Sequence, residues 1–125
     1  MRSLLTVFAI LALAACSSAR AGELITLSES ELPATAGMNA DVWQSSSWSV
    51  ADGSWIRFPA RTAVSIPHPL GRSPGSVNVY VSFDASGAAA AIASGDLAHI
   101  DAVTDERVTL SNNTNEDFFV RVALH

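Results

Sequence analysis

Apolar residues recur at alternate positions in short stretches of this chain, and turn residues separate the stretches. The clearest stretch is residues 77–83, where Val77, Val79, Val81 and Phe83 share one face and polar residues occupy the other. Related stretches cover residues 24–28, 48–50, 55–58, 62–66, 88–94, 100–103, 107–110 and 118–124. Asp52-Gly53 favours a hairpin turn, and the Asn-rich residues 111–115 favour another tight turn.

Short strands at this spacing predict an all-β fold, a single antiparallel β-sandwich or jelly-roll-like domain of about eight strands. Residues 88–94 are rich in alanine, which favours helix, but they are few and lie between two Gly-containing turns, so we expect a strand. We expect residues 118–124 in the middle of a sheet, paired through the Asn112-Asn113 turn. The expected core residues are Leu27, Ile56, Phe58, Val64, Ile66, Val77, Val79, Val81, Phe83, Ile100, Val108, Leu110, Phe118, Val120 and Val122.

The N-terminus has the pattern of a signal peptide: Arg2, then apolar residues 4–13 interrupted only by Thr6. Leu13-Ala14-Ala15-Cys16 follows and resembles the lipobox of bacterial lipoproteins. The resemblance implies a helical signal peptide at 1–15 and a lipidated Cys16, which begins a short tether at 16–23. The β-domain predicted from alternation then covers residues 24–125. The resemblance also implies a cell-envelope location, anchored in a membrane by lipid. By analogy with enterobacterial lipoproteins, Ser17 favours the outer membrane.

An alternative is an ordinary secretory signal, cut near Ala19 or Ala21, with loss of Cys16. The chain of 125 residues has a formal net charge of −5 and contains no lysine. An acidic chain is a poor partner for nucleic acid, which requires clustered positive charge. Because Cys16 is the only cysteine, its lipidation leaves no thiol for a disulfide or for catalysis.

Three tryptophans, Trp43, Trp48 and Trp55, lie close together in a serine-rich stretch. Flat indole faces suit the C–H faces of sugar rings, and nearby hydroxyls suit sugar hydroxyls. Strand alternation places Trp55 and Arg57 on the face opposite Ile56, so the two could form an exposed ligand platform. The alternative is that the tryptophans are buried, as large aromatic residues usually are.

Residues 68–74 form a second candidate, a loop that runs into the strand at Val77. With His68, Leu70, Gly71, Arg72 and Pro74, it resembles a His-x-Leu-Gly-Arg-x-Pro loop of small β-domains in phage tail and tail-fibre proteins. That resemblance covers residues 64–125 and implies a β-sandwich used for assembly or surface binding, with His68 and Arg72 as contacts. The alternative is a structural loop in which His68 bonds to backbone and Arg72 pairs with a carboxylate.

The chain contains no nucleophile elbow, zinc-protease helix motif or phosphate-binding Gly-rich loop. Asp96, His99, Asp101 and Asp105 are metal-binding residue types, but their spacing fits no known motif. We therefore expect no enzyme activity, cofactor or metal. The sequence predicts a lipid-anchored envelope module that binds a glycan or a protein partner. The alternatives are a structural assembly subunit and, less favoured, a small hydrolase with His68 or His99 in a cleft.

Overall fold

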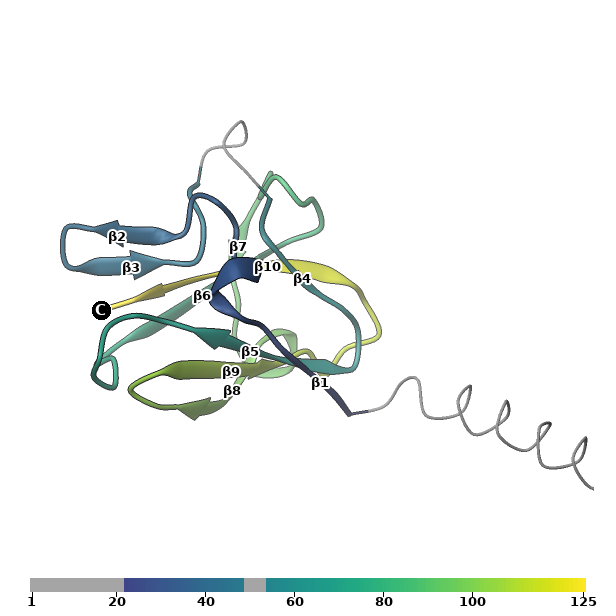
Figure 1. Cartoon of the computed structure of the whole chain (residues 1–125). Coiled ribbons are helices and arrows are strands. Elements are labelled where there is room, and N and C mark those ends of the chain that lie inside the picture. Colours follow the sequence, from purple (N-terminus) through teal and green to yellow (C-terminus); the bar gives the residue numbers. More distant parts are fainter. Residues whose placement is uncertain (1–21, 49–53) are drawn as a thin grey trace, which may run out of the picture.

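The computed structural model describes residues 22–48 and 54–125 of the chain. The expected signal peptide, Cys16 and the turn expected at Asp52-Gly53 lie outside these residues. Within the described residues, two β-sheets pack face to face, which confirms the predicted all-β sandwich (Figure 1). No helix in the described ranges is long and apolar enough to cross a membrane.

The smaller sheet has four strands in the order β1, β5, β9, β8. These strands are β1 (Glu23–Thr26), β5 (Thr62–Pro67), β9 (Arg107–Ser111) and β8 (His99–Val103). The β5–β9 and β9–β8 pairs are antiparallel, whereas β1 runs parallel to β5, which departs from the purely antiparallel expectation. A parallel neighbour needs a long connection, and three strands of the larger sheet lie in the chain between β1 and β5.

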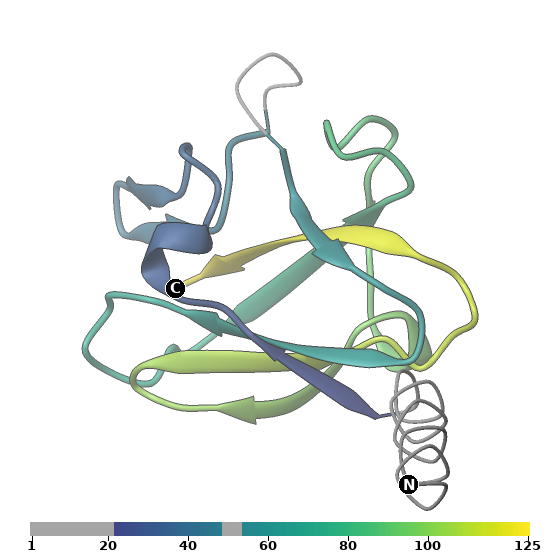
Figure 2. The ribbon, with the colours of Figure 1, turned by 45° about the vertical axis from the view of Figure 1, so that its right-hand side comes forward.

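The larger sheet has six strands, and β10 (Phe118–Leu124) lies at its centre (Figure 2). Along the sheet, β2 (Gly37–Asn39) pairs with β3 (Val42–Gln44), β3 with β10, β10 with β6 (Val77–Ser82), and β6 with β7 (Ala91–Ile92). The sixth strand, β4 (Ile56–Phe58), pairs with the first half of β10. The central position expected for residues 118–124 is therefore confirmed. The β2–β3 hairpin was not predicted, because its sequence shows no clear alternation.

The core lies between the sheets and follows the alternation in β10, where Phe118, Val120, Val122 and Leu124 are all buried. Most of the predicted core residues are buried with them, and Leu27 and Val77 are partly buried against the same cluster. The prediction was wrong for Phe83 and Ile100, which are 73% and 41% exposed.

Each of these two errors has a local cause. Strand β6 ends at Ser82, so Phe83 begins a turn and only stacks on the edge of the core, 4.9 Å from the ring of Phe118. Ile100 lies on the edge strand β8, four of whose five residues are exposed. Of the alanine-rich residues 88–94, only Ala91–Ile92 form a strand, followed by a short 3-10 helix at Gly95–Leu97.

The segment between β9 and β10 crosses from one sheet to the other, so the hairpin predicted through Asn112-Asn113 does not form. Asn112 is wholly buried and builds this corner. Its amide nitrogen donates to the carbonyls of Phe58 and Glu116, at 3.1 and 2.8 Å, and its oxygen accepts from the backbone N–H and hydroxyl of Thr114. A side chain that satisfies four backbone and hydroxyl partners holds the corner without a strand ladder.

Candidate functional site

The strand register places several polar and aromatic side chains on the outer face of the six-stranded sheet. Directly opposed residues share a face, and Arg121 of β10 opposes Tyr80 of β6, which opposes Ile92 of β7. In the next row, Ala123 of β10 lies between Gln44 of β3 and Asn78 of β6. The outer face therefore carries an aromatic and cationic row beside a row of amides.

Arg121 is the centre of this face. Although it is charged, it is only 2% exposed. Its guanidinium carbon lies 4.0 Å from the ring centroid of Trp48 and 5.4 Å from that of Tyr80. Its Nε donates to the carbonyl of Ser46 at 2.9 Å, and its Nη2 donates to Oε1 of Gln44. Burial lowers the pKa of Arg121, but an arginine remains protonated at any physiological pH.

Trp48 lies over the guanidinium and is held on several sides. Its ring meets Tyr80 edge-on, with centroids 4.7 Å apart, and meets Trp55 edge-on at 5.9 Å. Even so, Trp48 is 50% exposed. Because Arg121 covers one face of the indole, the exposed area belongs to the opposite face and the free edge. The result is a flat apolar surface whose orientation is fixed from below.

Trp55 supports this arrangement from within and is only 3% exposed. Its Nε1 donates to the carbonyl of Ser47 at 3.3 Å. Gly87 presses against its ring, so closely that a Cβ built on Gly87 would lie 2.4 Å from Trp55 Cε2. Trp55 therefore does lie on the outer face, as alternation predicts, but the loop around Gly87 and Trp48 cover it.

The prediction that three tryptophans and Arg57 together form an exposed platform is thus wrong. Trp43 points between the sheets, 2% exposed, with its ring 6.5 Å from the ring of His68. Arg57 is exposed but lies opposite Phe119, one row further along the sheet from Arg121. Only Trp48 presents a broad exposed indole surface.

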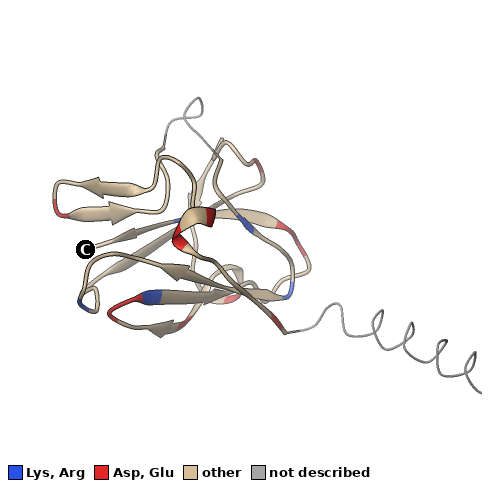
Figure 3. Cartoon of the chain, in the orientation of Figure 1, with Lys and Arg blue, Asp and Glu red and all other residues tan. Residues whose placement is uncertain are grey.

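A groove of about 630 Å³ opens beside Trp48. Its lining comes from the β2–β3 hairpin and the segments that flank it. No charged side chain lines it; the residues are Thr35, Ala36, Gly37, Met38, Asn39, Gln44, Ser47 and Trp48. Figure 3 shows the same hairpin without charge except at its turn, where Asp41 lies. Amides, hydroxyls and apolar atoms are therefore offered together.

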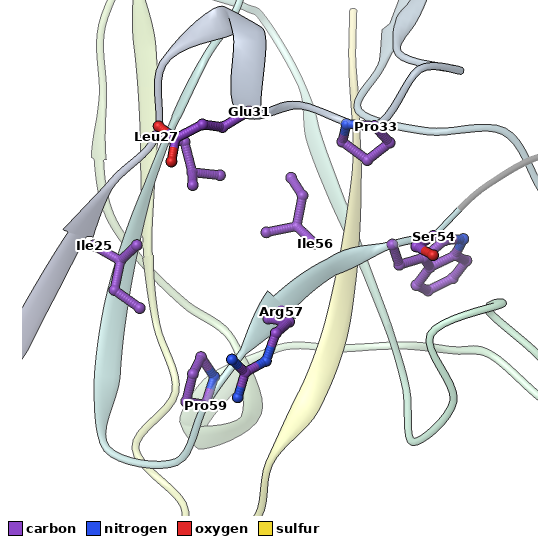
Figure 4. A pocket seen from close by; sticks show the side chains of 9 residues that line it. Ile25, Leu27, Glu31, Pro33, Ser54, Ile56, Arg57 and Pro59 are labelled. Carbon is purple, nitrogen blue, oxygen red and sulfur yellow. The ribbon is translucent and has the colours of Figure 1, made fainter.

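A second hollow, of about 410 Å³, lies between β1 and β4, which belong to different sheets (Figure 4). Ile25, Leu27 and Ile56 form its apolar walls, with Glu31 and Arg57 at its borders. The close-up shows the polar groups at separate borders and not converging on one point. Such a hollow offers apolar contact but no clear set of polar groups to orient a ligand.

The loop at residues 68–74 is structural at its first residue. His68 is buried, its Nε2 lies 2.9 Å from the carbonyl of Thr104, and its Nδ1 accepts from the backbone N–H of Leu70. Both imidazole nitrogens are therefore engaged with backbone, so His68 is not an exposed contact as the assembly interpretation expected. Arg72 is exposed, and it forms no ion pair with any residue that the structure describes.

A histidine lies beside a carboxylate on the edge strand β8. His99 Nδ1 lies 2.8 Å from Asp101 Oδ1, and Asp101 Oδ2 accepts from the hydroxyl of Ser111. The Ser111 hydrogen bond lowers the pKa of Asp101. The carboxylate separates the hydroxyl from the imidazole, so the imidazole cannot act as a base toward Ser111 in this arrangement. Across residues 22–48 and 54–125, no group of three or more His, Cys, Asp or Glu could hold a metal.

Sequence reasoning placed Gln44 beside the tryptophans but missed Tyr80 and Arg121 as members of the face. Arg121 could have been noticed as the single charge within the apolar residues 118–124. Its neighbours could not have been noticed in this way, because they come from strands that only the register brings together.

No family model matches this chain, and no curated protein or solved structure matches it.

Proposed function

We propose that this chain is a non-catalytic glycan-binding protein of the cell envelope, held to a membrane by a lipid on Cys16. The proposal rests on the indole of Trp48. Arg121 packs against one face of this indole, and the rest of the ring is exposed beside an uncharged groove. Sugar rings present apolar C–H faces and polar edges. A fixed aromatic surface next to amides and hydroxyls offers a partner for each.

The order within the face supports a chain-like ligand. Trp48, Tyr80 and the 76% exposed Ile92 follow one another across the sheet from the groove towards its edge. Asn78 is exposed in the row beside them. A glycan chain lying across the strands would meet apolar surface and amide groups along its length.

Pre-organisation favours binding by such a small surface. The Trp48 ring is already ordered by Arg121, Tyr80 and Trp55 before any ligand arrives. Less conformational entropy is then lost on binding than with a freely rotating indole. An anchor on Cys16 would hold the domain close to envelope polysaccharides, where local concentration is high.

The test is a titration of the purified protein with envelope polysaccharides and peptidoglycan fragments, followed by tryptophan fluorescence. We expect a saturable change in the wild type. Isothermal titration calorimetry, which does not need Trp48 as a reporter, should show that Trp48→Ala abolishes binding while far-ultraviolet circular dichroism stays unchanged. Phe83→Ala is the matched control, because Phe83 is a more exposed aromatic residue outside the face. Binding that survives Trp48→Ala, or that Phe83→Ala removes equally, would contradict the proposal.

The proposed lipidation of Cys16 is tested separately. Cells fed a labelled fatty acid should label the wild-type protein and not Cys16→Ser, with Ser17→Ala as a neighbouring control. Equal labelling of wild type and Cys16→Ser would overturn lipidation at this residue. The glycan proposal would then stand on the face alone.

Assembly is the second candidate function, favoured by the high exposure of Phe83 and Ile92, at 73% and 76%. Association with another chain would remove apolar surface of these side chains from water, which is favourable. Light scattering of the purified protein separates the two candidates. A concentration-dependent oligomer that Ile92→Ser dissociates would favour assembly.

A further inference from the structure

The guanidinium of Arg121 has more donors than the described residues use. An arginine carries five N–H donors. One on Nε and one on Nη2 have partners, Ser46 and Gln44. The other donors have no hydrogen-bond partner among residues 22–48 and 54–125.

The charge is also without a counter-ion. No carboxylate among the described residues lies within ion-pair distance of Arg121. The faces of Trp48 and Tyr80 supply attraction through their negative quadrupoles, which compensates a buried cation in part. A buried charge ordinarily has a partner of opposite charge, since desolvation is otherwise costly.

A second polar group close to it has no partner either. Ser46, whose carbonyl accepts from Arg121, is 1% exposed, and its hydroxyl makes no hydrogen bond within the described part of the chain. Arg121 and Ser46, which are joined through the Ser46 carbonyl, therefore both carry polar groups without full hydrogen bonding. Buried groups of this kind in a folded protein call for an explanation, and a bound ligand is one.

The guanidinium adjoins the groove through two residues. Gln44 and Trp48 both line the groove, and both contact Arg121. A guanidinium beneath an aromatic ring keeps its unused N–H donors near its own plane, alongside the ring and not through it. An anionic group entering the groove beside Trp48 would approach the charge of Arg121, which lies directly behind Gln44 and Trp48.

We propose that the glycan bound at this face carries carboxylate groups, and that one of them pairs with Arg121. The inference rests on the proposed glycan-binding function and specifies the class of sugar. Uronic acids satisfy it, because they combine a sugar ring for Trp48 with a carboxylate. The same buried charge disfavours amino sugars with a free ammonium group, which would place two cations close together.

The experiment compares matched short oligosaccharides on the purified full chain. Each set has a neutral sugar, its counterpart oxidised at C6 to the uronate, and its 2-amino counterpart, in the gluco, galacto and manno configurations. Trp48-dependent fluorescence reports affinity at low salt. In the set that binds, we expect the uronate to bind at least about tenfold more tightly than the neutral sugar, as a charged hydrogen bond contributes. The amino sugar should bind more weakly than the neutral one, and added salt should reduce both differences.

The outcomes separate the two proposals. If the neutral sugar binds as tightly as the uronate, the carboxylate inference is overturned and glycan binding stands. If no sugar in any set binds, both are overturned.

Two variants of Arg121 test whether its charge causes the preference for the uronate. Arg121→Met keeps an unbranched side chain beneath Trp48 and should reduce the ratio of uronate to neutral affinity to about one, whereas Arg121→Lys should retain a preference. Near-ultraviolet circular dichroism checks that the tryptophan packing persists. The salt dependence of the wild type tests the inference even if Arg121→Met does not fold. A uronate affinity that does not fall as salt rises would overturn it.

Discussion

Replacing Gly87 by alanine should damage both stability and the binding face, because Gly87 packs directly on Trp55. A Cβ at this position would lie 2.4 Å from Cε2 and 2.6 Å from Nε1 of the indole, inside any van der Waals contact. Gly87 also has φ of +81°, in the left-handed region that disfavours side chains. Trp55 is 3% exposed and cannot swing away without disturbing the core or Trp48.

The expected cost can be divided into parts. Left-handed backbone costs an alanine about 1 kcal/mol, partly offset because alanine restricts the unfolded chain more than glycine does. Displacing a packed indole adds about 1–3 kcal/mol, in the range of overpacked cores. Loss of the hydrogen bond from Trp55 to Ser47, if the ring moves, adds about 1 kcal/mol. We therefore expect Gly87→Ala to destabilise the fold by about 2–4 kcal/mol.

Gly71 is the matched control. It has a similar φ of +71°, but a Cβ there would meet nothing within 4 Å. Gly71→Ala therefore carries only the backbone part and should cost at most about 1 kcal/mol. Urea unfolding followed by circular dichroism measures both free energies, and the difference between the variants isolates the contact with Trp55.

A further readout connects the contact to the binding face. Because Trp55 meets Trp48 edge-on, Gly87→Ala should also change the near-ultraviolet circular dichroism of the tryptophans, and Gly71→Ala should not. If the two variants unfold at the same urea concentration, the packing of Gly87 against Trp55 does not constrain the protein and the reasoning is wrong.

Asn112→Ala should destabilise the fold by about 3 kcal/mol, because it leaves buried carbonyl and N–H groups without partners, whereas the exposed Asn113→Ala should cost under about 0.5 kcal/mol in the same urea assay. Phe83→Ala should cost under about 1 kcal/mol, although alternation places Phe83 on the core face, because it is 73% exposed. Asp101 has a lowered pKa in the fold, so its stabilising contribution should be complete above the ordinary pKa of about 3.9 and lost as the pH falls below it. Asp101→Asn should remove that part of the pH dependence of unfolding.

Each of these expectations has an opposing result. Equal costs for Asn112→Ala and Asn113→Ala would show that the corner is held by other contacts. A cost for Phe83→Ala of about 3 kcal/mol, as for a core phenylalanine, would place that residue in the core. An unchanged pH profile in Asp101→Asn would show that the hydrogen bond from Ser111 does not persist in solution.

Alternation along the sequence was sufficient to predict the all-β class and most of the core. The apolar positions of residues 77–81 and 118–124 become buried because a strand places every second side chain on one face, whatever its neighbours. Prediction failed where alternation extends past the end of a strand, at Phe83, or lies on an uncovered edge, at Ile100. Burial there depends on what lies opposite, which local pattern does not contain.

The candidate face was predicted only in part. The serine-rich stretch drew attention to Trp48, and alternation placed Trp55 and Arg57 correctly on the outer face of their strand. The local sequence could not show that Trp43 points inward. It also could not show that Gly87 covers Trp55, because Gly87 lies far along the chain.

The sequence alone therefore determined the fold class and the inward face of the long strands, because both follow from the two-residue period of a strand. Only the tertiary structure decided that Arg121, Tyr80 and Trp48 meet. Their contact depends on the register between β10 and β6 and on the path of the chain after β3. A one-residue slip of that register would turn the side chains of a strand to the other face. The binding face is thus a property of the strand pairing, which long-range packing sets.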